Sequence, residues 1–262
     1  MNALGRPPFV AATLAAAAAV CGLVLAGPPL LWLALAIPLA YCGLLVAGVM
    51  HPRLGMFARV VWRGPRFRPE IALTFDDGPD PTTTPKILAT LAAADARATF
   101  FVLGAKARRA PQVLREMAAA GHAIGIHGDT HDRRLSLRHP DILAAGLERN
   151  LAGVEAATGF RPSLFRPPLG HVSPRTAAAA KRLGLTLVAW SVRSRDGLAA
   201  TSAAAATRRV LSGLRPGAIV LMHDAAEHGD REPASIAALP AILDEAKRRG
   251  LRCVTLPQMQ RS

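Results

Sequence analysis

The first fifty residues constrain this chain more than any other part of it. Arg6 is their only charged side chain, and the stretch from Val10 to Met50 carries no charge at all. A secretory signal peptide has an apolar core of about 7–15 residues, so it accounts for only part of this stretch. A membrane-spanning helix needs about 20 apolar residues, and the stretch is long enough for two. We therefore expect residues 1–50 to form a membrane anchor.

The anchor is predicted to be a hairpin. Gly27, Pro28 and Pro29 interrupt the apolar stretch and favour a turn, which leaves two transmembrane helices at about 10–26 and 30–50. The alternative is one span that follows a cleaved leader. A hairpin returns both ends of the anchor to the same side of the membrane.

A basic linker, predicted over residues 51–69, follows the anchor. It contains five arginines, and the predicted turn contains no charge. By the positive-inside rule this asymmetry predicts a two-pass protein of a bacterial-type inner membrane, with residues 70–262 in the cytoplasm. If the first segment does not span, this domain lies on the extracytoplasmic face, which is the alternative. The arginines are Arg53, Arg59, Arg63, Arg66 and Arg68.

The charge of the whole chain favours anionic partners. The formal net charge is +14, from 32 Lys and Arg against 18 Asp and Glu. Such a surface attracts anionic lipid or a phosphorylated glycan carrier. Nucleic acid is not an expected partner, because we see no recognised binding motif and only 5% of the residues are aromatic and able to stack on bases.

Beyond the linker, short apolar runs alternate with Ala- and Leu-rich segments of helical spacing. This alternation predicts βα units and a parallel sheet, and seven strands suit a closed or nearly closed barrel. We expect a deformed (β/α) barrel with about seven parallel strands, preceded by the transmembrane hairpin. The expected strands are 71–75, 98–103, 123–127, 164–166, 186–192, 218–223 and 252–256, and the helices include 111–120, 141–158, 174–183, 203–214 and 235–249.

Polar side chains cluster where these strands end. Because the carboxyl ends of parallel strands meet on one face of a barrel, these side chains are expected to converge there, where the βα loops build active sites. They are Asp76, Asp77, His127, Arg166, Asp196 and His223.

Two of the strand ends offer metal ligands. His127 and His131 are four residues apart and can meet one ion across a helical turn. Two histidines and a carboxylate leave open positions for water and substrate; zinc is the default ion, and the set also suits iron(II), cobalt or nickel. Of the adjacent carboxylates Asp76 and Asp77, one can bind the metal while the other serves as general base. An Asx-turn is the structural alternative for this acidic pair.

The segment Thr74–Pro79, which reads TFDDGP, with the HxxxH that follows it, resembles the polysaccharide deacetylase family. This family, also named NodB homology or carbohydrate esterase family 4, includes chitooligosaccharide deacetylases, and the resemblance covers roughly residues 70–257. It implies a hydrolase that removes an N-acyl group from an amino sugar. The resemblance also implies that the metal is bound by Asp77, His127 and His131. Asp76 is the implied base, which Arg166 steadies, and His223 is the implied acid, which Asp196 orients. The backbone N–H of Leu169 is implied to contact the oxyanion.

The sequence departs from the family pattern at four places. Leu169 stands where an aromatic residue is usual, and Gly128 replaces a Ser or Thr. The family's fourth motif loses its aromatic residue at Gly197 and gains a cation at Arg193. These changes bear on sugar packing more than on chemistry. The family's third motif is matched by Arg166–Gly170, which reads RPPLG, and His171, which follows it directly, is a candidate for substrate contact.

Three functions compete at this point. The first is deacetylation of an extended N-acylated glycan. The second applies the same chemistry, including deformylation, to a polyprenyl-phosphate-linked amino sugar at the membrane. The third is a catalytically inactive, membrane-tethered carbohydrate-binding module. The third predicts loss of a metal ligand or of the acid, whereas all of these residues are present.

Overall fold

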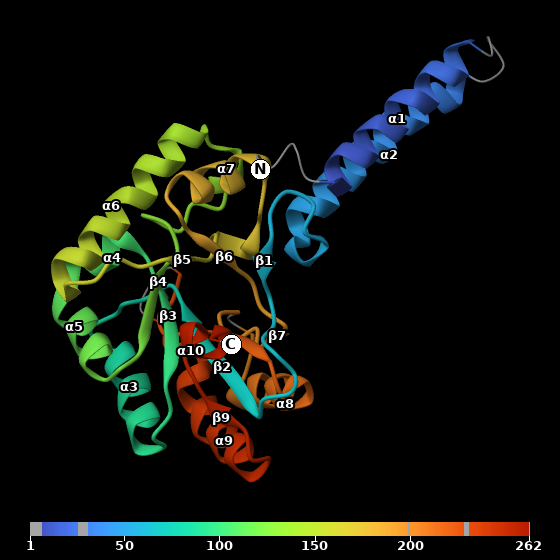
Figure 1. Cartoon of the computed structure of the whole chain (residues 1–262). Coiled ribbons are helices and arrows are strands. Elements are labelled where there is room, and N and C mark those ends of the chain that lie inside the picture. Colours follow the sequence, from blue (N-terminus) through green and yellow to red (C-terminus); the bar gives the residue numbers. More distant parts are fainter. Residues whose placement is uncertain (1–6, 26–30, 199, 228–230, 262) are drawn as a thin grey trace.

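The chain, described here from a computed structural model, forms a projecting helical hairpin and an α/β domain (Figure 1). The structure describes residues 7–25, 31–198, 200–227 and 231–261. The hairpin consists of α1 (Pro7–Leu25) and α2 (Leu31–Met50), which pack side by side. The Thr13 and Tyr41 hydroxyl oxygens lie 2.6 Å apart across their contact. The predicted turn at 27–29 lies outside the described residues.

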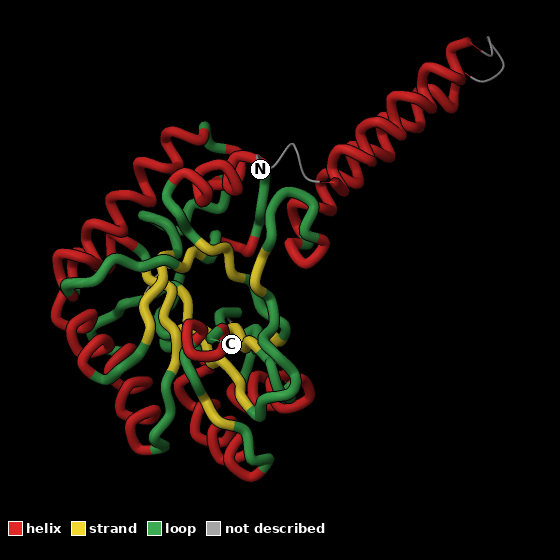
Figure 2. Tube along the Cα trace, in the orientation of Figure 1, coloured by secondary structure: helices red, strands yellow, loops and turns green. Residues whose placement is uncertain are grey.

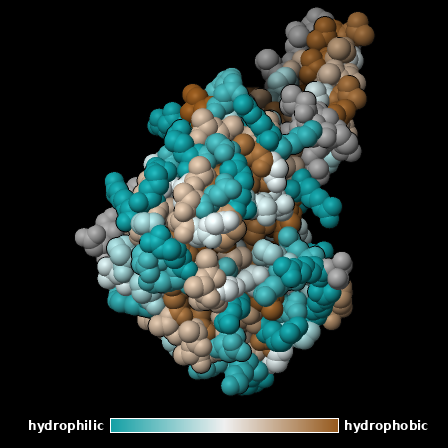
Figure 3. Space-filling model, turned by 60° about the vertical axis from the view of Figure 1, so that its left-hand side comes forward, coloured by the Kyte–Doolittle hydropathy of each residue, from teal (hydrophilic) through white to brown (hydrophobic). Residues whose placement is uncertain are grey.

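Both hairpin helices are long and apolar enough to cross a bilayer. Their apolar windows, Pro8–Leu25 and Trp32–Met50, are 0% and 6% buried within the protein. Figure 3 shows apolar side chains on the projecting helices and hydrophilic ones over much of the domain. A signal sequence near the N-terminus passes the same test of length and hydropathy, so the two helices are either membrane spans or include a signal sequence.

The domain is built on a curled parallel sheet, with its strands in a ring and its helices outside (Figure 2). The strand order is β1-β6-β5-β4-β3-β2-β8-β7, with β9 paired to the start of β2, and every described ladder is parallel. The strands are β1 (Val60–Val61), β2 (Glu70–Asp76), β3 (Ala98–Val102), β4 (Ala123–Ile126), β5 (Leu164–Phe165), β6 (Thr186–Val188), β7 (Val192–Arg193), β8 (Ile219–His223) and β9 (Arg252–Cys253).

Amphipathic helices connect most of these strands. Proline begins several of them, where its missing N–H costs no hydrogen bond, and left-handed glycines end or follow them. The helices are α3 (Thr84–Ala93), α4 (Gly104–Arg109), α5 (Pro111–Ala119), α6 (Pro140–Thr158), α7 (Pro174–Arg182), α8 (Ala203–Gly213), α9 (Ala234–Arg248) and α10 (Leu256–Gln260), with short 3-10 turns at Pro52–Leu54, Leu135–Leu137 and Pro168–Gly170.

The predicted parallel α/β barrel is confirmed, with two more strands among the described residues than the seven expected. The run expected as one strand at 186–192 is divided into β6 and β7. The chain crosses there from β6, the second strand in the order, to β7 at its far end, so the two halves pair with different neighbours. The second addition, β1, lies inside the segment expected to be a linker and pairs with β6.

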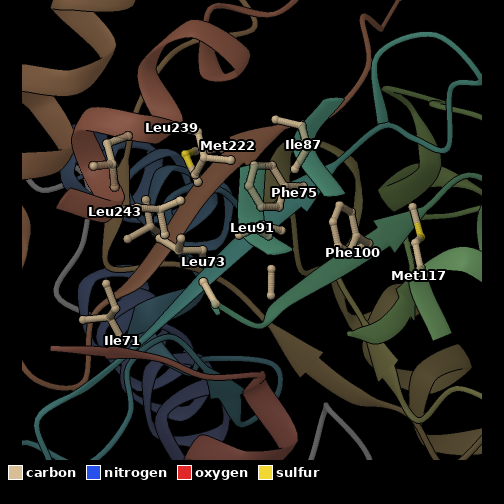
Figure 4. Packing of buried hydrophobic residues seen from close by; sticks show 14 of the residues in the cluster. Ile71, Leu73, Phe75, Ile87, Leu91, Phe100, Met117, Met222, Leu239 and Leu243 are labelled. Carbon is tan, nitrogen blue, oxygen red and sulfur yellow. The ribbon is translucent and has the colours of Figure 1, made fainter. Parts of the chain in front are cut away.

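The main core packs against β2. All seven residues of β2 are buried, because β3 and β8 flank it along most of its length. Phe75 stacks on Phe100 with ring centroids 5.2 Å apart, and Leu239 and Leu243 of α9 pack against the same cluster (Figure 4). The strand that ends at Asp76, the first aspartate of the TFDDGP motif, is therefore held in the core along its whole length.

Candidate active site

The ladder between β2 and β8 brings two of the predicted catalytic residues together. Asp76 ends β2 and is the register partner of His223, which ends β8. Asp77 follows directly, His127 follows β4, and Arg166 follows β5. All of these side chains lie at the carboxyl ends of the strands, as the sequence pattern predicts.

Asp77, His127 and His131 form a cluster that could hold a metal ion. Their ligand atoms all lie within 4.8 Å of one another, and Asp77 Oδ1 is 3.5 Å from His127 Nε2 and 3.6 Å from His131 Nε2. Ligands about 2.1 Å from one tetrahedral ion lie about 3.4 Å apart, which agrees with these separations. Asp77 Oδ1 is buried and has no hydrogen-bond partner among the described residues. A buried carboxylate oxygen facing two imidazole nitrogens fits a shared cation.

The neighbouring hydrogen bonds favour metal binding through the Nε2 atoms. His127 Nδ1 lies 2.7 Å from the carbonyl oxygen of Arg166, so Nδ1 carries the proton and Nε2 presents its lone pair toward Asp77. The loop between the histidines is held by Asn150, whose amide donates to the Gly128 carbonyl at 2.6 Å. Gly128 has φ +111°, which strains any residue with a side chain, so glycine at this departure from the family pattern suits the backbone.

His131 is also steadied from outside the metal cluster. Its Nδ1 lies 2.9 Å from Glu227 Oε1, and Arg133 donates two hydrogen bonds to the same carboxylate at 2.8 and 2.7 Å. The sequence analysis did not identify Glu227, because it lies in a loop far from the HxxxH motif and carries no pattern of its own.

A buried ion pair lies beside the candidate metal cluster. Arg166 is fully buried and donates from Nη1 to Asp76 Oδ1 at 2.7 Å and to Thr74 Oγ1 at 2.8 Å. Its guanidinium carbon lies 4.1 Å from the Phe101 ring centroid. Burial lowers the pKa of Arg166, while the Asp76 carboxylate acts in the opposite direction. The arginine offsets the charge of Asp76 and fixes its orientation.

Asp196 and His223 form a second pair on the other side of Asp76. His223 Nδ1 lies 2.9 Å from Asp196 Oδ1, and the His223 backbone N–H donates to Asp196 Oδ2 at 2.8 Å. Burial opposes the charged imidazole, but the Asp196 charge and hydrogen bond outweigh it, and the pKa of His223 rises to about 9. Ser194 also donates to Asp196. With Nδ1 occupied, Nε2 is the ring nitrogen left for a ligand.

The backbone is strained at three of the predicted motifs. Asp77, Leu169 and Arg195 have φ of +77°, +59° and +61°. Residues other than glycine adopt this region rarely, and such strain persists only where the surroundings impose it. Tertiary packing therefore fixes the backbone of Asp77, which is a candidate metal ligand, of Leu169, which is the predicted oxyanion residue, and of Arg195, which is the neighbour of Asp196.

The third motif places Leu169 and His171 at the rim of the site. Leu169 is 38% exposed and Gly170, its neighbour, packs against the indole of Trp190. Burial lowers the pKa of His171. Among the described residues no hydrogen bond or ion pair joins the His171 side chain to the rest of the site, so its substrate contact stays a prediction.

A buried carboxylate that the sequence analysis missed holds the TFDDGP loop. Asp224 accepts from the Gly78 backbone N–H at 3.1 Å and from the Thr84 hydroxyl at 2.6 Å. Burial raises the pKa of Asp224 to about 7. The signal was its position directly after His223, at the end of a buried strand.

Comparisons with known proteins agree with this geometry. The family model described as polysaccharide deacetylase matches residues 63–188. A peptidoglycan-N-acetylglucosamine deacetylase of Bacillus cereus is 35% identical over 196 residues, which cover 75% of this chain and 70% of that protein. A chitooligosaccharide deacetylase of Sinorhizobium fredii is 34% identical over 209 residues, which cover 77% and 97%.

A solved structure carries the same fold. The crystal structure of a peptidoglycan N-acetylglucosamine deacetylase in complex with a naphthalenyl N-hydroxybenzamide superposes with a TM-score of 0.71 at 34% identity, covering 76% of this chain and 91% of the other. The resemblance that the TFDDGP and HxxxH motifs carry is thereby confirmed. The chain belongs to the polysaccharide deacetylase family, whose hydrolases cleave the N-acetyl amide bonds of amino sugars.

Proposed function

We propose that this protein is a metal-dependent deacetylase of N-acetylglucosamine-containing glycans, acting at a membrane surface. The observation that carries the proposal is the arrangement of three groups side by side. The Asp77–His127–His131 cluster lies next to the Asp76 carboxylate, and the Asp196–His223 pair is in register with Asp76 across the β2–β8 ladder. This arrangement offers a metal, a base and an acid around one point.

The base is Asp76. Its Oδ1 is held by Arg166, and its Oδ2 lies 4.0 Å from His127 Nδ1, so the carboxylate lies beside the imidazole of one proposed metal ligand without belonging to the cluster. From there Asp76 takes the proton of the attacking water. Arg166 does not touch the substrate and acts by positioning Asp76.

The three metal ligands suit a borderline ion, and zinc is the ion we propose, with Co²⁺, Fe²⁺ or Ni²⁺ as substitutes that the same ligands accept. When bound, such an ion polarises the acyl carbonyl and makes water a stronger nucleophile at neutral pH. The protein holds Asp77 Oδ1 unpaired and both Nε2 atoms toward it, so the ligands are arranged before an ion arrives.

The acid is His223. Because the Asp196 pair raises its pKa to about 9, the imidazole is protonated at neutral pH and can give its proton to the departing amine. The Leu169 backbone N–H is proposed to stabilise the oxyanion, a role that needs a donor fixed in advance. The constrained φ of Leu169 supplies that fixed orientation. His171 is proposed to contact the sugar.

The substrate is an N-acylated amino sugar, either in a glycan such as peptidoglycan or chitooligosaccharide or on a polyprenyl phosphate. The hairpin favours a substrate at the membrane, because residues 1–50 would tether the domain to the bilayer. The arginines at 53, 59, 63, 66 and 68 could pair with lipid or carrier phosphates. On the positive-inside rule we place the domain, residues 70–262, in the cytoplasm. The test is a reporter that is active only on the extracytoplasmic side, fused at the C-terminus; activity of this reporter would reverse the assignment.

The test is acyl release by the purified full-length protein, loaded with zinc, from two substrates: an N-acetylglucosamine oligomer and a polyprenyl-phosphate N-acyl amino sugar. The substrate from which the acyl group is released identifies the protein as acting on the glycan or on the lipid-linked sugar. Detection of formate in place of acetate identifies a deformylase. Asp76→Asn should abolish release. Asp95→Asn is the matched control, since Asp95 is an exposed aspartate with φ +47° that asparagine tolerates. Zinc binding without release from either substrate would favour the inactive carbohydrate-binding module.

A further inference from the structure

The barrel has a seam, and the chain crosses it close to the active site. β1 and β7 are the two ends of the strand order, and within the described residues no ladder joins them. Residues 189–191 link β6 on one side of the seam to β7 on the other. Trp190 is the central residue of this crossing. Its backbone therefore depends on contacts other than a sheet ladder for its position.

The Trp190 side chain supports the segment that carries Leu169. A Cβ built on Gly170 would lie 2.5 Å from the indole Cη2, so indole and backbone are in direct contact. The indole centroid also lies 5.8 Å from the guanidinium carbon of Arg166, and Arg166 Nη2 donates to the Ala189 carbonyl at 3.1 Å. A shift of Trp190 would therefore move the surface against which Gly170 and Arg166 pack.

Arg53, from the segment just after the hairpin, holds the Trp190 backbone. Its Nη2 and Nε donate to the Trp190 carbonyl oxygen at 2.7 and 3.2 Å. The guanidinium also lies 5.2 Å from the Trp62 ring centroid. Two donors on one carbonyl fix both the arginine and the acceptor, and a charged donor makes the stronger kind of hydrogen bond.

The end of the hairpin also reaches the other side of the same segment. The Val172 backbone N–H donates to the Val49 carbonyl, in the last turn of α2, at 3.1 Å. Met56 and Phe57 pack against Phe9 and Ala177 in a small apolar cluster. The base of the hairpin lies beside β1 in Figure 1. The segment from Leu169 to Val172 is thus bounded by Trp190 on one side and by α2 on the other.

We infer that Arg53 is a positioning residue for catalysis: through Trp190 it holds the Leu169–Gly170 backbone in place, and it makes the base of the hairpin a structural part of the active site. The inference rests on the proposed function only in that the Leu169 N–H serves the oxyanion. The contacts themselves do not depend on what the substrate is.

The test compares Arg53→Gln and Arg53→Lys in the full-length protein in nanodiscs. Arg249→Gln is the matched control, because Arg249 is another arginine that donates to two backbone carbonyls, of Leu211 and Leu214, at 3.2 and 3.0 Å, away from the site. An oxyanion contact is made in the transition state, so its loss lowers kcat and kcat/KM together and leaves KM unchanged. We expect Arg53→Gln to lower kcat about fivefold to tenfold, as for one weakened charged hydrogen bond, and Arg53→Lys to recover part of the loss.

Amide hydrogen exchange gives a readout that needs no turnover. The Val172 amide donates to Val49, and the Gly170 amide donates to Pro167. Both amides should exchange faster in Arg53→Gln than in the wild type, and at the wild-type rate in Arg249→Gln. If the wild type is inactive on every substrate while this exchange difference persists, the proposed function fails. The part of the inference in which Arg53 holds the Leu169–Gly170 backbone then still stands. Unchanged exchange at both amides, or a kcat loss no larger than that of the control, would overturn the inference.

Discussion

The Asp196–His223 pair allows a pH prediction of defined size. Replacing Asp196 with asparagine keeps the shape of the side chain and removes its charge. Burial alone would lower the pKa of His223; the Asp196 charge and hydrogen bond are the largest contributions that raise it, with Asp77 and Asp76 adding less. Without the carboxylate, the imidazole should return to its ordinary pKa of 6.5 or fall below it.

The expected loss follows from the protonated fraction. At pH 7.5 an imidazole with a pKa of about 9 is about 97% protonated, whereas one with the ordinary value of 6.5 is about 9% protonated. Since the amine leaves only with a proton from the acid, kcat/KM of Asp196→Asn should fall at least tenfold, or about 1.4 kcal/mol. At pH 6.0 a group with a pKa of 6.5 is about 76% protonated, so most of that loss should disappear.

The assay is acetate release under kcat/KM conditions between pH 5.5 and 9.5, with both proteins at the same zinc loading so that they differ only at residue 196. The alkaline limb of the wild type should fall near pH 9, and that of the variant near or below pH 6.5. A defect of equal size at every pH would refute the reasoning, because it would show that Asp196 acts by orienting the ring and not by raising its pKa.

Three further outcomes are expected. Because the folded-state pKa of His223 is raised to about 9, the stability that the Asp196–His223 pair contributes should be fully present below pH 6.5 and lost as pH rises through 9. The free energies of unfolding in urea of the wild type and Asp196→Asn should therefore differ at pH 6 and converge at pH 9.5. Asp77→Asn should weaken zinc binding at least tenfold in a chelator competition while the circular dichroism stays unchanged, and equal affinity would exclude Asp77 as a ligand. Phe75→Ala should lower the free energy of unfolding by about 3–5 kcal/mol in urea titrations, since the fully buried ring stacks on Phe100, and a loss below 1 kcal/mol would contradict the packing.

Much of the fold could be predicted because its signals are local. Apolar runs bounded by Pro and Gly located β2, β3, β4 and β8 and five of the helices to within a few residues. The crossing at 189–191 could not be read in this way, because Thr186–Val188 and Val192–Arg193 look like one apolar run and differ only in their partners. Partner choice depends on tertiary packing, which periodicity does not encode.

The candidate site also contains residues that local sequence signals predict and residues that they do not. Residues at strand ends, such as Asp76, His127 and His223, could be placed because parallel strands carry their carboxyl ends to one face. Asp224 and Glu227 were missed because their partners, Gly78, Thr84 and His131, are distant in sequence. The positive φ of Leu169 also has no sequence signal, since leucine disfavours that region and only the fold imposes it.

The pairing of β2 with β8 has a consequence for the order of events in synthesis. The Thr74 hydroxyl donates to the Val220 carbonyl across a separation of 146 residues, and Asp76 meets His223 through the same ladder. Contacts this distant along the chain form late and slowly, whereas the hairpin is complete after the first fifty residues leave the ribosome. A nascent chain would therefore leave β2, all of whose residues are buried in the folded domain, exposed on one edge until β8 emerges. Deacetylase activity would begin only at the end of translation, long after the hairpin has left the ribosome.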